Sequence, residues 1–443
     1  MTSDAIVVGG GVGGLVVARR LALEGRRVTL LEQTGALGGQ VARQRIAGVD
    51  LDAGAESFAT RSGAVAALLA ELGLDGDIVT PSPTPAWLHR ADGSAVPLPA
   101  TGLLGIPGDP LAADVIRAIG RAGAERAAQD AEIPAETGTD ASSLGELVRA
   151  RMGDAVVEGL VTPVVRGVHS ISADALPVER AHPRLRAEIL AQGSLAAAVR
   201  ALRAASPAGS QVAGIRGGMF RLVDALAADC RRLGVRIELG AHVEEWDAEG
   251  VVVAGERHVG VVVPAGGGPG GPGDAQSGAA GPAPAGSRLV TLVTLAADAP
   301  GWDGAPRGTG LLVAPGAPGV GARALTHLTA KWGWVAEALP GRHAVRLSYD
   351  GVPGDAVATA TRDAGILLGS PLRQLLDATE YTWVRRVAQP AGDLPVVGET
   401  AAGTGLASVV PHAERIAREL IAGELSETRR IRRGSGAGGR MEG

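Results

Sequence analysis

Closely spaced glycines near the N-terminus are the first residues in this sequence that could bind a ligand. The apolar run at residues 5–8 leads into Gly9, Gly10, Gly11, Val12, Gly13 and Gly14, which satisfy the pattern G-x-G-x-x-G in register. In this pattern the first glycine allows a tight turn, the second lets the backbone approach a pyrophosphate, and the third permits close packing of helix against strand. The segment therefore predicts a phosphate-binding turn between a strand and a helix.

An acidic residue stands where such a unit needs one. Helical periodicity follows the glycines as far as Leu23, Gly25 ends the helix, and a second apolar strand at 28–31 leads to Glu32. A carboxylate in that place accepts hydrogen bonds from a ribose. Because strand, helix, second strand and acid all fall at the expected spacing, we predict a dinucleotide-binding unit rather than a glycine-rich turn without a ligand.

A second glycine pair soon after Glu32 favours FAD as the dinucleotide. Gly38 and Gly39 suit a backbone that passes close to a bound cofactor, and residues 51–58 follow as LDAGAESF. The residues from this part of the chain that we expect to contact FAD are Gln33, Gly38, Gly39, Gln40, Gly54, Ala55, Glu56 and Ser57.

This opening resembles that of the protoporphyrinogen and coproporphyrinogen oxidases, within the FAD-dependent amine oxidase and desaturase superfamily. Similar segments recur along the chain, namely VPLP at 96–99, LGIP at 104–107, TPVVRGV at 162–168, RGG at 216–218, AKW at 330–332 and the glycine-rich turn at 398–406. The resemblance implies an α/β fold in which a Rossmann-like FAD-binding domain is joined to a mixed-sheet substrate domain and an all-helical insert.

The resemblance also implies domain boundaries. The FAD-binding domain is expected to be discontinuous, over residues 1–78, 205–264 and 382–425. The substrate-binding domain is expected at 79–107 and 287–381, and the helical insert at 108–204. Composition adds a Gly/Pro-rich flexible loop at 265–286, which cannot bury enough apolar area to order itself, and a disordered basic tail at 426–443.

Site residues in the later part of the chain follow from the same resemblance. Val243 is implied on the adenine side of FAD, and the C-terminal turn contributes Gly398, Glu399, Thr400, Gly405 and Leu406. Arg166, Gly167 and Lys331, the sole lysine, are the implied substrate residues. Two departures from the family stand out. Many members carry a basic residue near the position of Thr84, where it is implied to meet a substrate propionate, and this chain has none; the link from Pro390 to Gly398 is also shorter than in the family.

The implied reaction is the oxidation of a porphyrinogen, most often coproporphyrinogen III, by FAD with O2 as acceptor, in heme biosynthesis. The flavin carries the redox chemistry, so no catalytic side chain is expected. Expected contacts include the porphyrinogen, O2, a peripheral membrane surface and a transfer partner in heme synthesis. Three alternatives stay open: a flavin amine oxidase, a carotenoid-type desaturase, and a non-catalytic FAD- or porphyrin-binding relative.

Composition bounds the remaining classes. The chain has 443 residues, 46% of them hydrophobic, and a formal net charge of −5, which does not favour nucleic acid as a partner. No unbroken run of 18 apolar residues predicts a membrane span, and no basic segment precedes the first strand as in a signal peptide. The single cysteine, Cys230, predicts a packed side chain with no disulfide or metal site, and a cytoplasmic location.

Overall fold

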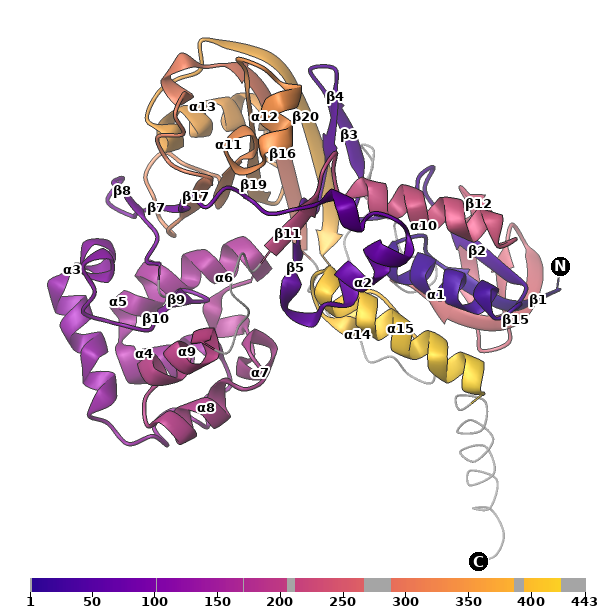
Figure 1. The fold of residues 1–443 in the computed structure, drawn as a ribbon, viewed down its shortest axis with the longest axis horizontal. Coiled ribbons are helices and arrows are strands. Elements are labelled where there is room, and N and C mark those ends of the chain that lie inside the picture. The colour runs from indigo at the N-terminus through magenta and orange to yellow at the C-terminus, as the bar shows by residue number, and fades with distance from the viewer. Residues whose placement is uncertain are drawn as a thin grey trace, which may run out of the picture.

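The computed structural model describes residues 2–100, 102–169, 171–204, 212–266, 288–385 and 394–423 (Figure 1). Three parts of the sequence that carried predictions lie outside these residues: the Gly/Pro-rich segment beyond Gly266, the link around Pro390, and the tail at 426–443.

A six-stranded sheet contains the predicted strand–helix–strand unit. Its order is β12-β2-β1-β15-β14-β13, and β1 runs parallel to both β2 and β15, so Ala5 lies opposite Val28 and Val261. The carboxyl ends of β1 and β2 therefore meet at one edge, where Gly9 and Glu32 lie. The strands are β1 (Thr2–Val8), β2 (Val28–Glu32), β12 (Arg236–Leu239), β13 (Val243–Trp246), β14 (Gly250–Val253) and β15 (Glu256–Pro264).

Four helices share one hydrophobic core with this sheet. They are α1 (Val12–Leu23), α2 (Ala64–Glu71), α10 (Phe220–Arg232) and α15 (Leu406–Ala422). The buried residues of α15 recur at helical spacing, as in Leu406, Val410, Ala413 and Ala417, so one stripe of this C-terminal helix faces the N-terminal α1. The two ends of the described chain thus pack together.

A seven-stranded sheet has the order β20-β16-β19-β18-β17-β7-β8. Helix α13 covers one of its faces, and the hairpin β3–β4 with α11 and α12 packs on the other. These elements are β3 (Arg43–Ile46), β4 (Val49–Asp52), β7 (Trp87–His89), β8 (Ala95–Pro97), β16 (Arg288–Asp298), β17 (Gly310–Val313), β18 (Ala324–His327), α11 (Leu328–Lys331), α12 (Gly333–Ala338), β19 (His343–Asp350), α13 (Ala356–Leu368) and β20 (Gln374–Arg385).

Seven helices with a core of their own form the third part. They are α3 (Ala113–Ala128), α4 (Leu144–Met152), α5 (Asp154–Val156), α6 (Thr162–His169), α7 (Val178–Ala181), α8 (Leu185–Gln192) and α9 (Leu195–Ala204), and the small strands β9 (Gly102–Leu103) and β10 (Ile106–Pro107) pair beside them. Ser143 and Glu146 close a capping box on α4. This box satisfies N–H groups that would otherwise have no partner at the helix start.

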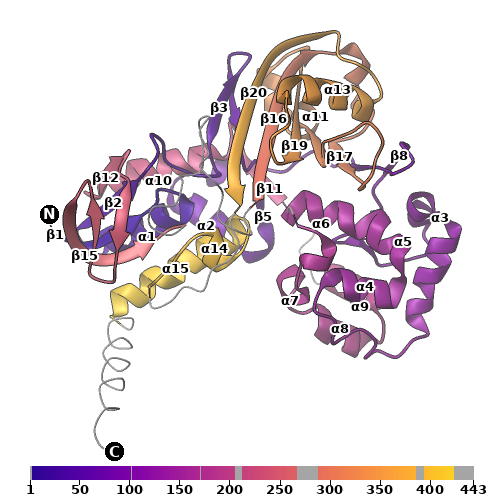
Figure 2. The ribbon, with the colours of Figure 1, turned by 180° about the vertical axis from the view of Figure 1, so that it is seen from behind.

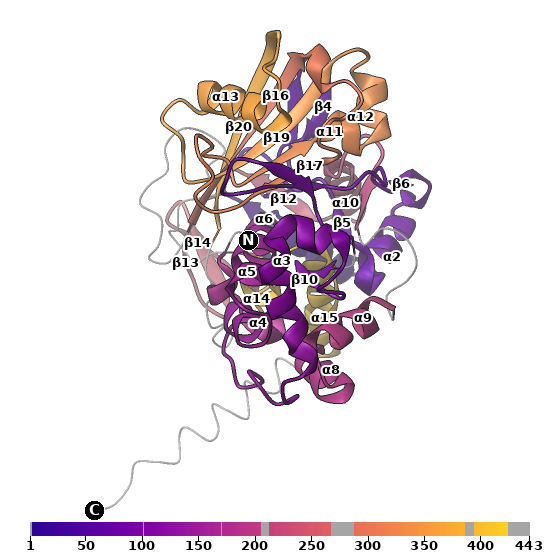
Figure 3. The ribbon, with the colours of Figure 1, turned by 90° about the vertical axis from the view of Figure 1, so that its left-hand side faces the viewer.

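The three parts meet near the middle of the molecule. Figures 1 and 2 show the six-stranded sheet with α1, α10 and α15 at one end, and the helices α3 to α9 at the other. Seen from the side, the seven-stranded sheet lies above these helices (Figure 3). The short strands β5 (Phe58–Ala59), β11 (Val212–Ile215) and β6 (Ile78–Val79) pair in that order, and β5, β11 and α14 (Glu399–Ala402) lie near the middle of the molecule (Figure 1).

Candidate nucleotide site

A cavity lies at the edge of the six-stranded sheet where β1 and β2 end. Segments from both ends of the sequence form its wall, and we refer to it as the nucleotide cavity. The predicted cofactor residues that line it are Gly9, Gly11, Val12, Gly13, Gly14, Glu32, Gln33, Gly38, Gly39, Gln40, Ala55, Ser57, Val243, Gly398, Glu399, Thr400, Gly405 and Leu406.

The glycine turn exposes its backbone to this cavity. Gly11 precedes α1 with φ −67° and ψ 172°, and no side chain caps the helix. A Cβ atom built on Gly11 would meet no atom within 4 Å, whereas one on Gly14 would lie 2.1 Å from the carbonyl oxygen of Gly9. The open space at Gly11 and the uncapped N–H groups of α1 suit a phosphate. The absence of a side chain at Gly14 is instead needed for helix–strand packing.

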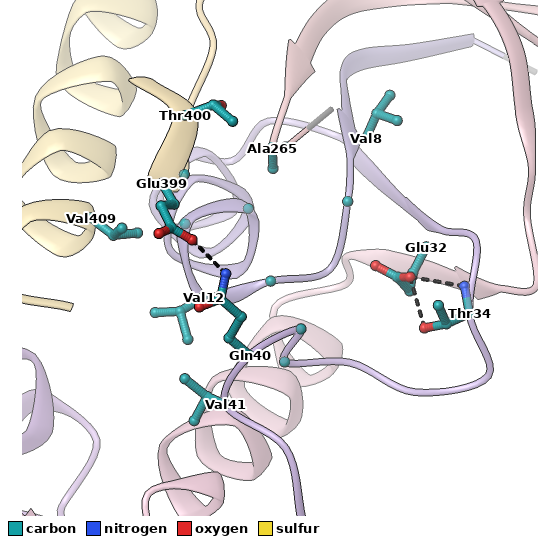
Figure 4. A pocket seen from close by; sticks show the side chains of 18 of the residues that line it. Val8, Val12, Glu32, Thr34, Gln40, Val41, Ala265, Glu399, Thr400 and Val409 are labelled. Carbon is teal, nitrogen blue, oxygen red and sulfur yellow. Dashed lines mark hydrogen bonds between the residues drawn. The ribbon is translucent and has the colours of Figure 1, made fainter. Parts of the chain in front are cut away.

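Hydrogen bonds hold Glu32 in a single orientation. One carboxylate oxygen accepts from the backbone N–H of Gly10 at 2.6 Å. The other accepts from the N–H and the hydroxyl of Thr34, both at 2.8 Å, as Figure 4 shows. An ionised carboxylate has about four acceptor positions, so these three bonds leave one for a ribose hydroxyl. Gly10 therefore holds the Glu32 carboxylate through its backbone N–H and does not itself line the cavity.

The C-terminal segment forms the opposite wall, where Glu399 faces Gln40 (Figure 4). The side-chain amide of Gln40 donates to Glu399 at 2.5 Å, and Nε of Arg385 lies 3.2 Å from the other carboxylate oxygen. The hydroxyl of Thr400 is buried and has no hydrogen-bond partner in the described part of the chain. A buried hydroxyl without a partner is costly, so Thr400 marks a place where a bound ligand would supply one.

Glu56 points away from the cavity that its neighbours Ala55 and Ser57 line. It forms ion pairs with Lys331 and Arg346, each at 2.5 Å, and all three side chains are largely buried. Burial by itself would raise the pKa of Glu56, but the two cations hold that pKa below its usual value. Lys331, an implied substrate residue, thus meets Glu56, an implied cofactor residue.

Backbone packing accounts for Gly54, which also lies off the cavity wall. A Cβ on Gly54 would lie 2.1 Å from the carbonyl oxygen of Gln40, and Arg346 donates to the carbonyl oxygen of Gly54 at 2.9 Å. This glycine therefore keeps the segment before Ala55 close to the segment that carries Gln40.

Arg166 and Gly167 lie on α6, away from the nucleotide cavity. Arg166 pairs with Asp350 at the end of β19, with 2.9 Å between Nη2 and a carboxylate oxygen. A Cβ on Gly167 would lie 2.5 Å from Leu312 of β17, so this glycine allows α6 to approach the seven-stranded sheet.

Several residues of the cavity wall were not predicted from the sequence. They are Val8, Leu31, Thr34, Val41, Ala241, Trp246, Ala265, Gly266, Val384 and Val409. Position alone could have suggested two of them, because Thr34 lies two residues after Glu32 and Val409 lies one helical turn after Gly405. Val384 is adjacent to Arg385 at the end of β20, and no sequence signal places that strand end on the wall.

These observations together show that the residues present fit a dinucleotide. The wall contains a glycine cradle at the start of α1, an oriented acid at Glu32, and a second helix, α15, that begins at Gly405 without a side-chain cap. Within the described ranges, no group of three or more His, Cys, Asp or Glu side chains could hold a metal ion. Cys230 is buried in the core, and burial raises the pKa of its thiol to about 12, so it is a poor nucleophile.

Comparison with known proteins agrees with this arrangement. The family model described as flavin containing amine oxidoreductase matches residues 12–265. The coproporphyrinogen III oxidase of Mycobacterium leprae is 30% identical over 406 residues, covering 86% of this chain and 85% of that protein. The enzymes of the same name from Staphylococcus aureus and Mycobacterium tuberculosis are 27% and 32% identical, but those matches span only 55% and 58% of their lengths.

Solved structures share the fold. A candidate protoporphyrinogen oxidase from Exiguobacterium sp. 255-15 is similar with a TM-score of 0.75 and 21% identity, over 94% of this chain and 98% of that one. A putrescine oxidase bound to putrescine is similar with a TM-score of 0.62 and 17% identity, over 95% and 99% of the two chains. None of the helices in the described residues is long and apolar enough to cross a membrane.

Proposed function

We propose a function from one premise: the chain belongs to the flavin-containing amine oxidoreductase family. It uses FAD to oxidise a porphyrinogen, and coproporphyrinogen III, converted to coproporphyrin III with O2 as acceptor, is the substrate that the named relatives support best. The place of this reaction is heme biosynthesis.

The proposed roles in the nucleotide cavity follow its geometry. The N–H groups at the start of α1 bind the pyrophosphate, Glu32 accepts a hydrogen bond from the adenosine ribose, and Val243 contacts the adenine side. The turn at Gly398 to Leu406 would hold the flavin, and the uncapped N-terminus of α15 would stabilise negative charge there. When bound, FAD supplies the redox chemistry, so the chain's own task is to bind, orient and exclude water.

The observation that carries the choice against an amine oxidase is the composition of the wall beside the flavin. Amine oxidases usually frame the flavin with aromatic side chains from the C-terminal segment, but residues 398–411 contain none. Trp246 is the one aromatic residue among the described residues that line the cavity, and it lies on β13 beside Val243 at the adenine end. The described residues that line the proposed flavin end are thus small, polar or aliphatic, as in Gly398, Thr400 and Leu406, and none is aromatic.

On the substrate side we propose Arg166 and Gly167 of α6, together with Lys331. Gly167 allows α6 to pack against the seven-stranded sheet, and Arg166 places a cation between this sheet and the helical part. Lys331 donates one N–H group to Glu56. Because an ammonium group has three N–H donors, the other two could reach a substrate, and this contact stays a prediction.

The test is an aerobic assay of the purified, FAD-loaded protein with coproporphyrinogen III and with protoporphyrinogen IX. Porphyrin fluorescence and H2O2 are followed together, and putrescine and benzylamine serve as amine controls. We expect porphyrin formation with matching H2O2. Binding of FAD without turnover of either porphyrinogen above the spontaneous rate would refute the proposal and favour the non-catalytic relative, while turnover of an amine would favour the amine oxidase.

A further inference from the structure

Two arginines from different parts of the fold converge on Asp350, the last residue of β19. Arg323, just before β18, donates from Nη1 to one carboxylate oxygen at 2.7 Å, and Arg166 of α6 donates from Nη2 to the other at 2.9 Å. We call Arg166 and Arg323 the arginine pair. With Asp350 included, the group carries a net charge of +1.

Arg323 has more hydrogen-bond donors than the protein uses. Its side chain is only 5% exposed, yet in the described part of the chain that side chain donates one hydrogen bond, and its Nε is buried without a partner. A guanidinium has five N–H donors in a fixed fork that matches a carboxylate. Leaving buried charged donors unmatched is costly, so the surroundings of Arg323 suit a second anion.

The arginine pair lies at the end of the seven-stranded sheet that faces the nucleotide cavity. In the strand register, Asp350 of β19 lies opposite Val290 of β16. Two residues before Val290 on β16, Arg288 lies opposite Arg385 of β20. Val384 lines the nucleotide cavity, and Arg385 pairs with Glu399 of its wall. Burial, together with repulsion from Arg385 and Arg166, lowers the pKa of Arg323 although the pairing with Asp350 opposes this shift.

Asp350 is well placed to orient the pair. It is 44% exposed, whereas Arg166 is 29% exposed and Arg323 is 5% exposed, so the carboxylate holds one partly accessible and one buried cation. Burial by itself would raise the pKa of Asp350, but the two arginines hold it below its usual value, so Asp350 stays ionised near neutral pH.

We propose that Arg323 and Arg166 bind a carboxylate side chain of the substrate, with Asp350 as the positioning residue for both guanidinium groups. The inference rests on the proposed function and deepens it, because coproporphyrinogen III carries four propionates and a neutral ring. Arg323 thereby provides a protein cation for a substrate carboxylate, in a chain that lacks the basic residue that the family implies near Thr84.

The test compares Arg166→Gln, Arg323→Gln and Arg323→Lys with wild type, all loaded with FAD. Arg149→Gln is the matched control, since Arg149 lies on the helical part, is 35% exposed and forms ion pairs with Asp154 and Asp174. Three quantities are measured: KM and kcat for coproporphyrinogen III, and Kd by fluorescence quenching for coproporphyrin III and its tetramethyl ester. FAD absorbance and Tm report on folding.

Each Gln variant should raise KM for coproporphyrinogen III and Kd for coproporphyrin III about 10-fold, with kcat within about twofold of wild type, because a charge-assisted contact with one carboxylate is lost. The Kd of the tetramethyl ester and all values for Arg149→Gln should not change. Arg323→Lys should recover part of the loss, since it keeps the charge without the fork.

Unchanged Kd for coproporphyrin III in both Gln variants, or an equal loss for acid and ester, would overturn the role of the arginine pair while leaving the proposed function intact. A wild-type protein that neither binds nor forms a porphyrin would overturn both. Should Arg323→Gln fail to fold, Arg166→Gln and Arg323→Lys carry the test.

Discussion

Substitution of two glycines of one motif should impair different properties, namely FAD binding for Gly11 and the stability of the fold for Gly14. In Gly11→Val the backbone is already extended, and the new side chain enters open space in the cavity, so the cofactor-free protein should fold. Its free energy of unfolding should change by no more than about 1 kcal/mol, because valine is a poorer residue than glycine before a helix. In Gly14→Ala a Cβ would lie 2.1 Å from the Gly9 carbonyl oxygen and 2.9 Å from Cβ of Ala265, so α1 must shift. Overpacking of this kind costs about 1–3 kcal/mol.

FAD binding, in contrast to stability, should be affected most in Gly11→Val. The valine side chain of Gly11→Val occupies the space that the pyrophosphate needs, so we expect binding to be lost, with Kd raised at least about 100-fold, or about 2.7 kcal/mol. The assay removes FAD, measures unfolding in urea, and then titrates FAD by fluorescence. Wild-type affinity in Gly11→Val would refute the phosphate site, and unchanged stability in Gly14→Ala would refute the packing argument.

Three further predictions concern the buried charges and the cofactor. Glu56→Gln leaves the cations Lys331 and Arg346 without their carboxylate and should lower the free energy of unfolding by about 3–5 kcal/mol. Lys331→Met keeps the Glu56–Arg346 pair and should lower it clearly less, as measured by unfolding in urea. Equal losses in the two variants would contradict the role of Glu56 between the two cations. Burial raises the pKa of Asp52 from 3.8 to about 7, so the folded protein keeps a proton that the unfolded chain releases, and stability should fall by at most about 4 kcal/mol as pH rises from about 4 to 7. Asp52→Asn retains an acceptor for the N–H of Phe220 and should remove this fall from Tm measured against pH; an unchanged slope would assign it to another group. The purified protein should be yellow, and acid precipitation should release all the FAD, because no His or Cys is among the described residues that line the cavity; flavin that stays with the precipitate would show a covalent link.

Short-range patterns in the sequence were enough to predict the strand, turn and helix around which the nucleotide cavity is built. The turn at Gly9 to Gly14, the helix that follows it and the acid at the end of β2 lie where the sequence predicted them. Each depends on backbone sterics, hydrophobic period or capping within about 25 residues, so neighbouring residues carry the necessary information. The roles assigned to these residues toward FAD stay predictions.

Only the tertiary structure determined how charged residues are paired. Lys331 meets Glu56 across 275 positions, and Arg166 meets Asp350 across 184, so no local pattern could reveal either pair. The sequence supplied Lys331 and Arg166 as two candidate substrate cations, but packing of the seven-stranded sheet on the nucleotide-binding part places the first against a buried carboxylate. Arg323 was not predicted, because an arginine before a strand is unremarkable until the fold brings Asp350 at the end of β19 and Arg166 of α6 to it. The physical reason is that the environment of a buried charge depends on which elements pack around it, and residues distant in sequence provide those elements.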